Sequence, residues 1–469
     1  MQWYEFLTHN QVEQIHETSL NILEQVGIEF RYPPALEVFK KAGAKIEGER
    51  VYLSPKMVMR QIKNAPAQFT IHARNPENDV VIGGDNIAFV PGYGAPFVTD
   101  LEKGRREGTL LDFKNFVKLT GASRFQDICS GMVIEPTDVP ADRRHAEMIY
   151  TALKYADKPI MGSAMGAKGA RDSSRMASIM FGTEQELAEK PRLIGLLCSL
   201  TPLSYDDRML GAIVAYAKAG QPQLISSLAI AGATSPATMA GTLALQNAEV
   251  LAGIVLTQLV RAGTPVIFAG ASTNAEMRTG ALSIGSPEMA VNTAATAQMA
   301  RYYNLPSRSG GAVSDSKSPD AQAAYESMMS LLMAQVSGIN FVLHAAGIFE
   351  SYNCMSYEKF IIDDEMCGMV KRIKKGYAVN EDTLGLSVTA ETGPGGHFLD
   401  KDHTIRHFRN EFYMSALSDR DSYDGWKERG SPTSMQAANR KYQEILAAYE
   451  APELPGDVDR ELKTFIETL

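Results

Sequence analysis

Three of the eight histidines in this chain, His397, His403 and His407, lie within the segment LSVTAETGPGGHFLDKDHTIRHF, residues 386–408. His403 and His407 are four residues apart and would share one face of a helix, a spacing that metal ligands often have. The segment does not complete a known zinc pattern, because the aspartates between His397 and His403 are close only in sequence. We therefore expect no metal site in this chain.

The glycines just before His397 indicate a tight turn. Gly393, Gly395 and Gly396 permit backbone conformations with positive φ, which other residues seldom adopt. Such a turn would bring His397 close either to the mouth of an active site or to a docking surface. This interpretation accounts for the glycines, whereas a metal site does not.

Arg308 is a second candidate for chemistry, because it lies in the run SRSGGAVSDS, which is expected to form a strand. A guanidinium in such a run must face an anion, since burying an unpaired charge is costly. The anion is Asp315, Glu350 or the carboxylate of a ligand, and the sequence leaves these three open.

His344 lies in the strand-like run NFVLHAAGIFE. Alternation places it on one face with Asn340 and Val342, and we expect this more polar face to point inward. His344 then either binds a ligand or is a core histidine that is hydrogen-bonded to a neighbouring strand. Two carboxylates have simpler alternatives: Asp315 would cap the next helix, and Glu249, inside a long helix, is expected to be solvated or capping.

Aromatic residues are expected near the same place. Tyr93 ends the run IAFVPGYG, with Phe89 and Phe97 nearby, and Phe349 lies near the end of NFVLHAAGIFE. Each of them alone suits ordinary packing. Together they would form a box for a quaternary ammonium ion, because the faces of aromatic rings attract a cation.

These candidates are far apart in sequence and need a fold that gathers strand ends. Short apolar runs bounded by Gly, Pro, Ser or Thr alternate with stretches of helical length, and they begin about 31 to 42 residues apart. The eight runs start at Ile87, Ile128, Pro159, Leu193, Leu224, Pro265, Ser307 and Asn340. This pattern predicts an α/β fold, an eightfold β/α barrel (TIM barrel) with its chemistry at the carboxyl ends of the strands. An open doubly wound sheet would need a Gly-x-Gly-x-x-Gly turn after an early strand, which the sequence lacks.

The barrel is expected to have additions at both ends. Thr8 or Asn10 is predicted to cap a helix that stops at Gly27, within a mixed segment. We expect an N-terminal α+β extension at 1–85, a barrel core at 86–352, and a helical C-terminal segment at 353–469 that carries the glycine-rich loop 392–397.

Composition limits the classes of partner. The chain has 469 residues and a net charge of −9, without a long Lys/Arg run, so nucleic acid and anionic membrane surfaces are not expected partners. Four scattered cysteines without a Cys-x-x-Cys pair favour a reducing compartment. The sequence shows neither a signal-peptide pattern nor an apolar run long enough to cross a bilayer, so we expect a cytoplasmic protein.

The stretch AETGPGGHFLDKDHT, together with PGYGAP, SLTPLS, NAEVLAGIVLTQLVRAGTPV and LHAAG, resembles the trimethylamine methyltransferase superfamily over nearly the whole chain. The resemblance implies a barrel that moves a methyl group from a methylated amine to the cobalt of a separate corrinoid protein. Archaeal members carry pyrrolysine, whereas this chain contains only standard residues and is similar to the non-pyrrolysine, glycine betaine:corrinoid methyltransferase-like branch. Glycine betaine is the expected substrate, with proline betaine, carnitine and γ-butyrobetaine as alternatives.

On this resemblance no acid, base or metal takes part, because a quaternary nitrogen leaves directly as a neutral tertiary amine. The chain itself holds no cofactor, and the methyl acceptor is the cobalamin of the corrinoid protein. A homo-oligomer is expected. The hypothesis assigns Tyr93, Phe89 and Phe349 to the ammonium, Arg308 and His344 to the carboxylate, Glu350 or Asp315 to negative potential or to holding Arg308, and Gly395, Gly396 and His397 to a corrinoid-facing loop.

Two other classes stay open from the sequence. A zinc-dependent methyltransferase acting on thiols or methanol also uses a corrinoid acceptor, but it would need a soft ligand set that the cysteine pattern disfavours. A non-catalytic betaine-binding protein would have the same aromatic box without the reaction.

Overall fold

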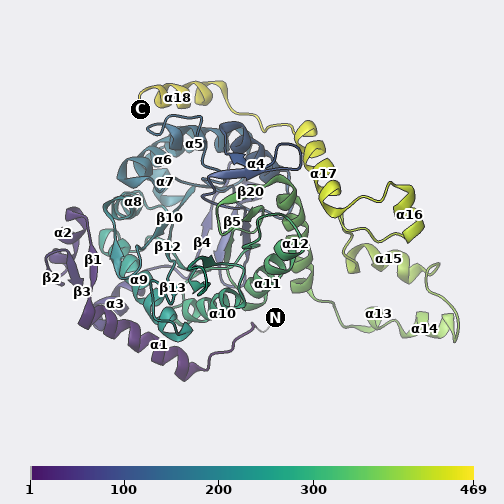
Figure 1. The fold of residues 1–469 in the computed structure, drawn as a ribbon, viewed down its shortest axis with the longest axis horizontal. Helices are drawn as coiled ribbons and strands as arrows, with labels where there is room; N and C mark the ends of the chain where they lie inside the picture. The colour runs from purple at the N-terminus through teal and green to yellow at the C-terminus, as the bar shows by residue number, and fades with distance from the viewer. Residues whose placement is uncertain (1–2) are drawn as a thin grey trace.

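The barrel is present in the computed structural model, which describes residues 3–469 (Figure 1). Parallel strands pair in the order β6-β18-β17-β14-β12-β10-β9. Their bounds are β6 (Ala88–Val90), β9 (Ile160–Met161), β10 (Leu193–Cys198), β12 (Gln223–Ser227), β14 (Val266–Gly270), β17 (Ser307–Arg308) and β18 (Phe341–Leu343).

Residues 127–130 close the circle between β9 and β6. Cys129 forms a parallel bridge with Ile160, and the backbone N–H of Asp127 donates to the Phe89 carbonyl oxygen at 2.7 Å. The run that begins at Ile128 therefore contributes a single bridge instead of a full strand. With it, the predicted eightfold barrel is confirmed.

A helix follows each position of the barrel and packs outside it (Figure 1). Asp320, and not Asp315 as expected from the sequence, caps α11, and the left-handed Gly338, at φ 76°, ends it. The helix α12 lies in the same ring beside α11, although the boundary expected at residue 352 assigned it to the C-terminal segment. The helices are α4 (Leu110–Ala122), α5 (Arg144–Tyr155), α6 (Gly166–Phe181), α8 (Asp207–Lys218), α9 (Met239–Val260), α10 (Pro287–Tyr302), α11 (Ala321–Ser337) and α12 (Tyr357–Lys375).

Alternation along the strands divides the core into two layers. One layer fills the barrel with side chains that include Ala88, Val90, Ala269, Phe341 and Leu343. The other layer lies between the strands and the surrounding helices.

The helix α9 belongs almost entirely to the outer layer. It has 22 residues and is apolar enough to cross a membrane by length and composition, contrary to the expectation from the sequence. In the fold 89% of its most apolar window is buried, so α9 is a core helix of the barrel wall.

The N-terminal extension packs on the barrel wall and covers its amino end. Thr8 caps α1 (His9–Asn21) in a capping box with Gln11, and the π-helical turn η1 (Ile22–Val26) ends at Gly27, which confirms the predicted helix. Both α1 and α3 (Pro55–Ile62) contact α9. The hairpin of β4 (Gln68–Ile71) and β5 (Val80–Gly83) packs on the interior layer at the amino end of the barrel. The chain between η1 and α3 forms β1 (Ile28–Phe30), α2 (Pro33–Lys41), β2 (Lys45–Glu47) and β3 (Arg50–Tyr52).

Loops at the carboxyl end of the barrel, here called the mouth, form small sheets of their own. One sheet has the order β19-β20-β7-β8 and another the order β13-β15-β16, while β11 pairs with β1 of the extension. Their bounds are β7 (Phe97–Thr99), β8 (Arg106–Glu107), β11 (Ser204–Tyr205), β13 (Ile230–Ala231), β15 (Thr273–Ala275), β16 (Leu282–Ser283), β19 (Ile348–Phe349) and β20 (Cys354–Ser356).

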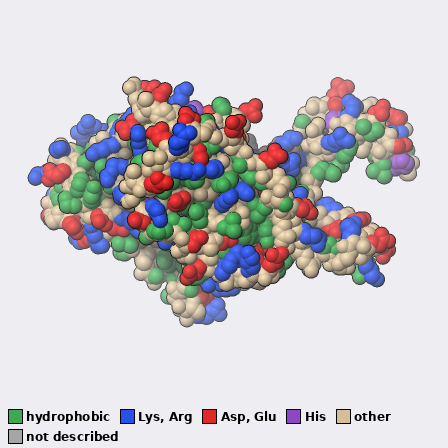
Figure 2. All heavy atoms as spheres, turned by 90° about the horizontal axis from the view of Figure 1, so that it is seen from above, with side chains coloured by type: hydrophobic (Ala, Val, Ile, Leu, Met, Phe, Trp, Pro, Cys, Tyr) green, Lys and Arg blue, Asp and Glu red, His purple; other side chains and the backbone are tan. Residues whose placement is uncertain are grey.

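After α12 the chain leaves the barrel as a projecting arm, residues 376–430 (Figures 1 and 2). It then returns, so that α17 packs on α12 and α4, and α18 packs on α5 and α6. The helices of this part are α13 (Glu381–Leu384), α14 (Leu386–Thr392), α15 (Asp402–Glu411), α16 (Tyr423–Glu428), α17 (Ser434–Ala448) and α18 (Gly456–Glu467).

Candidate functional site

Arg308 points into the barrel near its mouth. Its register partners on the neighbouring strands are Ala269 and Phe341, which both belong to the interior layer. The side chain is buried, and burial lowers its pKa, yet a guanidinium stays charged at neutral pH. Within residues 3–469 no carboxylate pairs with it, and its Nε has no hydrogen-bond partner. A buried cation without an anion indicates a place for an anionic ligand.

His344 lies directly after β18, and its ring is held in the neutral form. Burial, together with the charge of Arg308, holds the pKa of His344 well below its usual value. The backbone N–H of Tyr93 donates to its Nδ1 at 3.2 Å, so the proton of the neutral ring is on Nε2. His344 has φ 66°, and a Cβ at Gly311 would collide with the carbonyl oxygens of Leu343 and His344.

Tyr352 is a site residue that sequence reasoning missed. Glu350, Ser351 and Tyr352 have φ of 53°, 50° and 72°, a left-handed conformation that costs on the order of 1–3 kcal/mol per residue. The Tyr352 ring lies 4.6 Å from the ring of His344, centroid to centroid. Its hydroxyl is buried without a hydrogen-bond partner in the described part of the chain, and burial raises its pKa to about 12 against the opposing charge of Arg308. The only sequence signal was an aromatic residue just beyond the last strand.

Tyr93 lies beside His344, on the neighbouring strand end. It follows β6 and packs on the interior layer, and burial raises the pKa of its hydroxyl. Tyr352 thus lies near the Arg308 guanidinium and the His344 ring, and Tyr93 adjoins His344 through its backbone. Phe349 is buried on β19, on the face opposite to Ile348, which packs into the main core.

Phe89 does not belong to the site, and its assignment to the ammonium is wrong. It pairs in register with Val342, and both pack outward against α11 and α12, where Lys371 Nζ lies 5.1 Å from the Phe89 ring. The expectation that Val342 faces inward is wrong for the same reason. Phe341 and Leu343 fill the barrel instead. His344 reaches the mouth because its left-handed backbone ends the alternation of β18.

Neither Asp315 nor Glu350, the two carboxylates that the sequence offered as partners, holds Arg308. Glu350 forms a bidentate pair with Arg105, with N–O distances of 3.0 and 3.1 Å. Asp315 accepts hydrogen bonds from the backbone of Ile284 and Gly285 and from Ser351 Oγ, and Asp320 is the cap of the following helix. Of the three anions that the sequence left open, only a ligand carboxylate remains.

A buried ion pair fixes the loops that carry these residues. Lys359 Nζ donates to Asp363 Oδ2 at 2.6 Å and to the Ala312 carbonyl oxygen at 2.9 Å. Asp363 Oδ2 also accepts from the Gly347 N–H at 2.7 Å. Burial raises the pKa of Asp363 to about 6 and lowers that of Lys359. Because the Ala312 N–H donates to the His344 carbonyl oxygen, the pair supports the backbone at His344.

Glu249 is a second positioning group that the sequence did not identify. It is fully buried, so the expectation of a solvated or capping carboxylate is wrong. It accepts hydrogen bonds from Ser199 Oγ, Thr201 Oγ1, Ser227 Oγ and the Leu203 N–H, at 2.5 to 3.1 Å. These donors follow or end β10 and β12, so Glu249 ties two strand ends together at the mouth. Burial raises its pKa.

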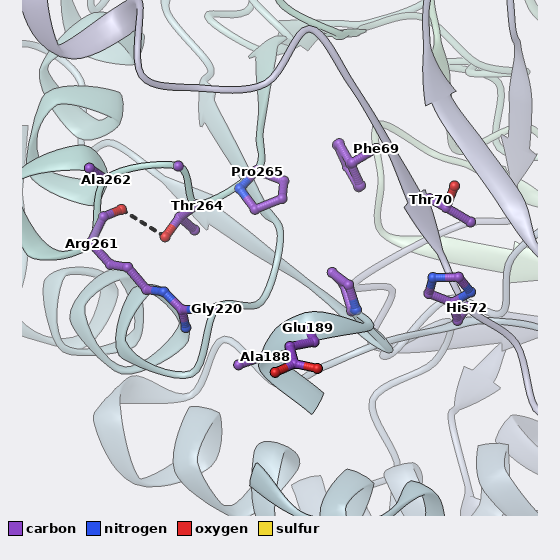
Figure 3. A pocket seen from close by; sticks show the side chains of 12 residues that line it. Phe69, Thr70, His72, Ala188, Glu189, Gly220, Arg261, Ala262, Thr264 and Pro265 are labelled. Atoms are coloured by element: carbon purple, nitrogen blue, oxygen red, sulfur yellow. Dashed lines mark hydrogen bonds between the residues drawn. The ribbon is translucent and has the colours of Figure 1, made fainter. Parts of the chain in front are cut away.

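A cavity of 420 Å³ lies at the opposite end of the barrel (Figure 3). Pro191, Gly220 and Pro265 line it and precede β10, β12 and β14. It therefore lies at the amino ends of the strands, where barrels of this kind do not place their chemistry.

The glycine-rich loop lies on the arm, away from the strand ends (Figure 1). Positive φ is confirmed for Gly393 and Gly395, and a Cβ at Gly396 would collide with the Thr392 carbonyl oxygen. His397 is exposed, and its Nδ1 lies 3.5 Å from Asp400 Oδ1. His403 and His407 share a face of α15, as their spacing predicted. Asp382 of α13 lies next to them.

The sequence matches the family model described as trimethylamine methyltransferase (MTTB) over residues 1–468. It is 53% identical to a glycine betaine methyltransferase of Desulfitobacterium hafniense (strain Y51), over 99% of this chain and 96% of the relative. It is 32% identical to a trimethylamine methyltransferase MttB of D. hafniense (strain DSM 10664 / DCB-2), over 97% of this chain and 91% of the relative. A proline betaine:corrinoid methyltransferase of Eubacterium limosum is 31% identical, over 96% of this chain and 94% of the relative.

The fold has a solved counterpart. The crystal structure of the Methanosarcina barkeri monomethylamine methyltransferase MtmB superposes with a TM-score of 0.57 at 10% identity, and it covers 96% of this chain and 90% of that one. At this identity the similarity concerns the fold alone. The family match over nearly every residue, together with the barrel and the identity to its members, leads to one conclusion: the chain belongs to the trimethylamine methyltransferase family.

Proposed function

We propose that this chain transfers a methyl group from glycine betaine to the cob(I)alamin of a corrinoid protein. The observation that carries the choice of substrate is Arg308, a buried cation without a protein anion. Trimethylamine has no anionic group and would leave that charge unpaired, whereas a betaine carboxylate would neutralise it. The 53% identity to a glycine betaine methyltransferase supports the same choice.

The proposed binding mode uses both ends of the substrate. Arg308 and the Nε2–H of His344 bind the carboxylate. The ring faces of Tyr93 and Tyr352 hold the quaternary ammonium, since a cation without a proton to donate is recognised best by aromatic rings. Phe349 is proposed to extend this aromatic wall. Asp315 adds negative potential at the ammonium end, whereas the charge of Glu350 is balanced by Arg105.

Transfer requires no proton from the protein. When a C–N bond of glycine betaine breaks, its electron pair stays on nitrogen, and dimethylglycine leaves as a neutral tertiary amine. This matches a neutral His344, which here binds and orients without donating a proton to the leaving group. The corrinoid, held by its own protein, supplies the nucleophile and accepts the methyl group. The chain contributes by fixing one methyl group toward the mouth.

The rim of the mouth supports a protein partner. Met165, Leu200 and Met277 follow β9, β10 and β14, and their side chains are 49%, 52% and 75% exposed. Exposed apolar side chains on three loops at one end of a barrel are typical of a protein-binding surface. We propose that the corrinoid protein docks there, with the loop at 395–397 (Gly395, Gly396, His397) as a further contact.

Three more properties are part of the proposal. The chain itself holds no corrinoid, because its partner brings it. It acts in the cytoplasm, where the corrinoid protein is expected. It forms a homo-oligomer, which the large apolar side chains exposed on the arm support, among them Tyr377, Leu386 and Leu399.

A substrate panel with free cob(I)alamin tests the proposal. Methylation of the corrinoid is expected with glycine betaine and more slowly with proline betaine or carnitine, while trimethylamine and choline give none. Methylation with trimethylamine alone would contradict the proposal. Tight binding of glycine betaine without transfer to free cob(I)alamin or to any corrinoid protein would identify a non-catalytic betaine-binding protein instead.

A further inference from the structure

The projecting arm, residues 376–430, has helices but no core of its own. In the described chain, none of the helices α13, α14, α15 and α16 contains a buried residue. A segment of this size without a hydrophobic core is usually held by a disulfide, a metal ion or a partner. All four cysteines lie outside the arm, which excludes a disulfide within it.

One cluster within the arm joins two of its helices. His403 and His407 lie one turn apart on α15, and their ring centroids are 4.4 Å from each other. Asp382, on α13, lies against both: its Oδ2 is 3.0 Å from His407 Nε2, and its carbonyl oxygen is 3.0 Å from His403 Nε2. One ligand atom from each of the three residues lies within 4.8 Å of the others.

The hydrogen bonding of the cluster is incomplete. His407 Nε2 is buried and has no hydrogen-bond partner in the described chain, although Asp382 Oδ2 is near, because the geometry does not allow a hydrogen bond. A simple His–Asp pair would satisfy this nitrogen. Arg406 Nη2 lies 3.5 Å from the other carboxylate oxygen, Oδ1, and would orient the carboxylate from outside.

We propose that Asp382, His403 and His407 bind a Zn²⁺ ion that clasps α13 to α15. Two imidazole nitrogens and one carboxylate oxygen suit Zn²⁺, whereas Mg²⁺ and Ca²⁺ prefer oxygen ligands alone. Histidines at positions i and i+4 of a helix are a common arrangement for this ion. Water completes the coordination, and the ion is structural. The proposal does not depend on the methyl-transfer function, because the arm lies outside the barrel.

Zinc binding by the full-length protein tests the proposal. The purified chain is dialysed against EDTA and titrated with Zn²⁺ in competition with a chromophoric chelator. We expect one tight site per chain, an affinity at least about 100-fold lower for the His403→Ala/His407→Ala variant, and an unchanged affinity for the control His397→Ala. Equal affinity in the wild type and the double variant, or no binding at 100 µM Zn²⁺, would overturn the proposal.

Two further readouts do not rely on activity. Limited proteolysis of the wild type should cut within 376–430 faster without Zn²⁺ than with it, while the double variant shows no such difference. X-ray absorption at the zinc edge of the wild type, which needs no variant, should show scattering from two imidazole rings. A shell of oxygen atoms alone would contradict the ligand set.

Discussion

Replacing Arg308 with methionine is expected to weaken glycine betaine binding and yet to stabilise the free protein. The side chain is 3% exposed and has no anion among the described residues, so without ligand its charge is buried and unpaired. The effective burial cost of such a charge is several kcal/mol. Methionine fills a similar volume without charge, so the free energy of unfolding should rise by about 1–4 kcal/mol.

Ligand binding should change in the opposite direction. A hydrogen bond to a charged group contributes about 1.5–3 kcal/mol, and the Arg308 guanidinium would give a carboxylate two of them. Allowing for the dehydration of both groups, the net loss is about 3–4 kcal/mol. The Kd for glycine betaine should therefore rise by roughly two to three orders of magnitude, since about 1.4 kcal/mol is tenfold.

Isothermal titration with glycine betaine and urea unfolding measure the two effects. Arg192→Met is a matched control at the amino end of the barrel, where Arg192 donates to the Ala73 carbonyl oxygen and stacks on Phe181. It should lose stability without a change in Kd. The reasoning is refuted if Arg308→Met binds glycine betaine as tightly as the wild type, or loses as much stability as Arg192→Met.

Three further predictions concern the surroundings of the site. Since burial holds the pKa of His344 well below 6.5, the unfolded chain binds a proton that the native state excludes, so stability should fall as the pH drops below about 6.5. The His344→Asn variant, whose asparagine tolerates a left-handed φ, should show a smaller dependence of the free energy of unfolding on pH, measured by urea unfolding between pH 5 and 8. An unchanged pH dependence would contradict the assignment of this effect to His344. Lys359→Met should cost about 3–5 kcal/mol because it leaves Asp363 buried and unpaired, and adding Asp363→Leu should restore most of the loss. Met277→Asp should raise the KM for the corrinoid protein about tenfold without changing the rate with free cob(I)alamin, and a parallel change in both would place Met277 elsewhere.

Much of the fold was predictable because it follows from local patterns. The eight apolar runs marked the positions of the barrel, although the run at Ile128 forms a single bridge. Thr8 and Gly27 marked the ends of the first helical segment, since capping is determined by neighbouring residues. The role of α12 was not predictable in this way. Its composition does not distinguish a helix of the barrel ring from one in an added segment.

The site was predictable only in part. Arg308 was identified because a buried charge needs an anion, but its lack of a protein partner depended on contacts across the chain. Glu350 pairs with Arg105, which is 245 residues away in sequence. Val342 was misplaced because the facing of β18 was judged from His344, whose left-handed backbone breaks the alternation. Phe89 was misplaced because it is close to Tyr93 in sequence, although its side chain packs outward beside Val342. Asp382 was missed because it is 21 residues before His403.

A crystal structure with glycine betaine bound tests the central claim most directly. We predict density for the ligand at the mouth, with its carboxylate on Arg308 and its trimethylammonium group against the rings of Tyr93 and Tyr352. Glycine betaine in the cavity at the amino end of the barrel, or at the mouth with its carboxylate turned away from Arg308, would contradict the account.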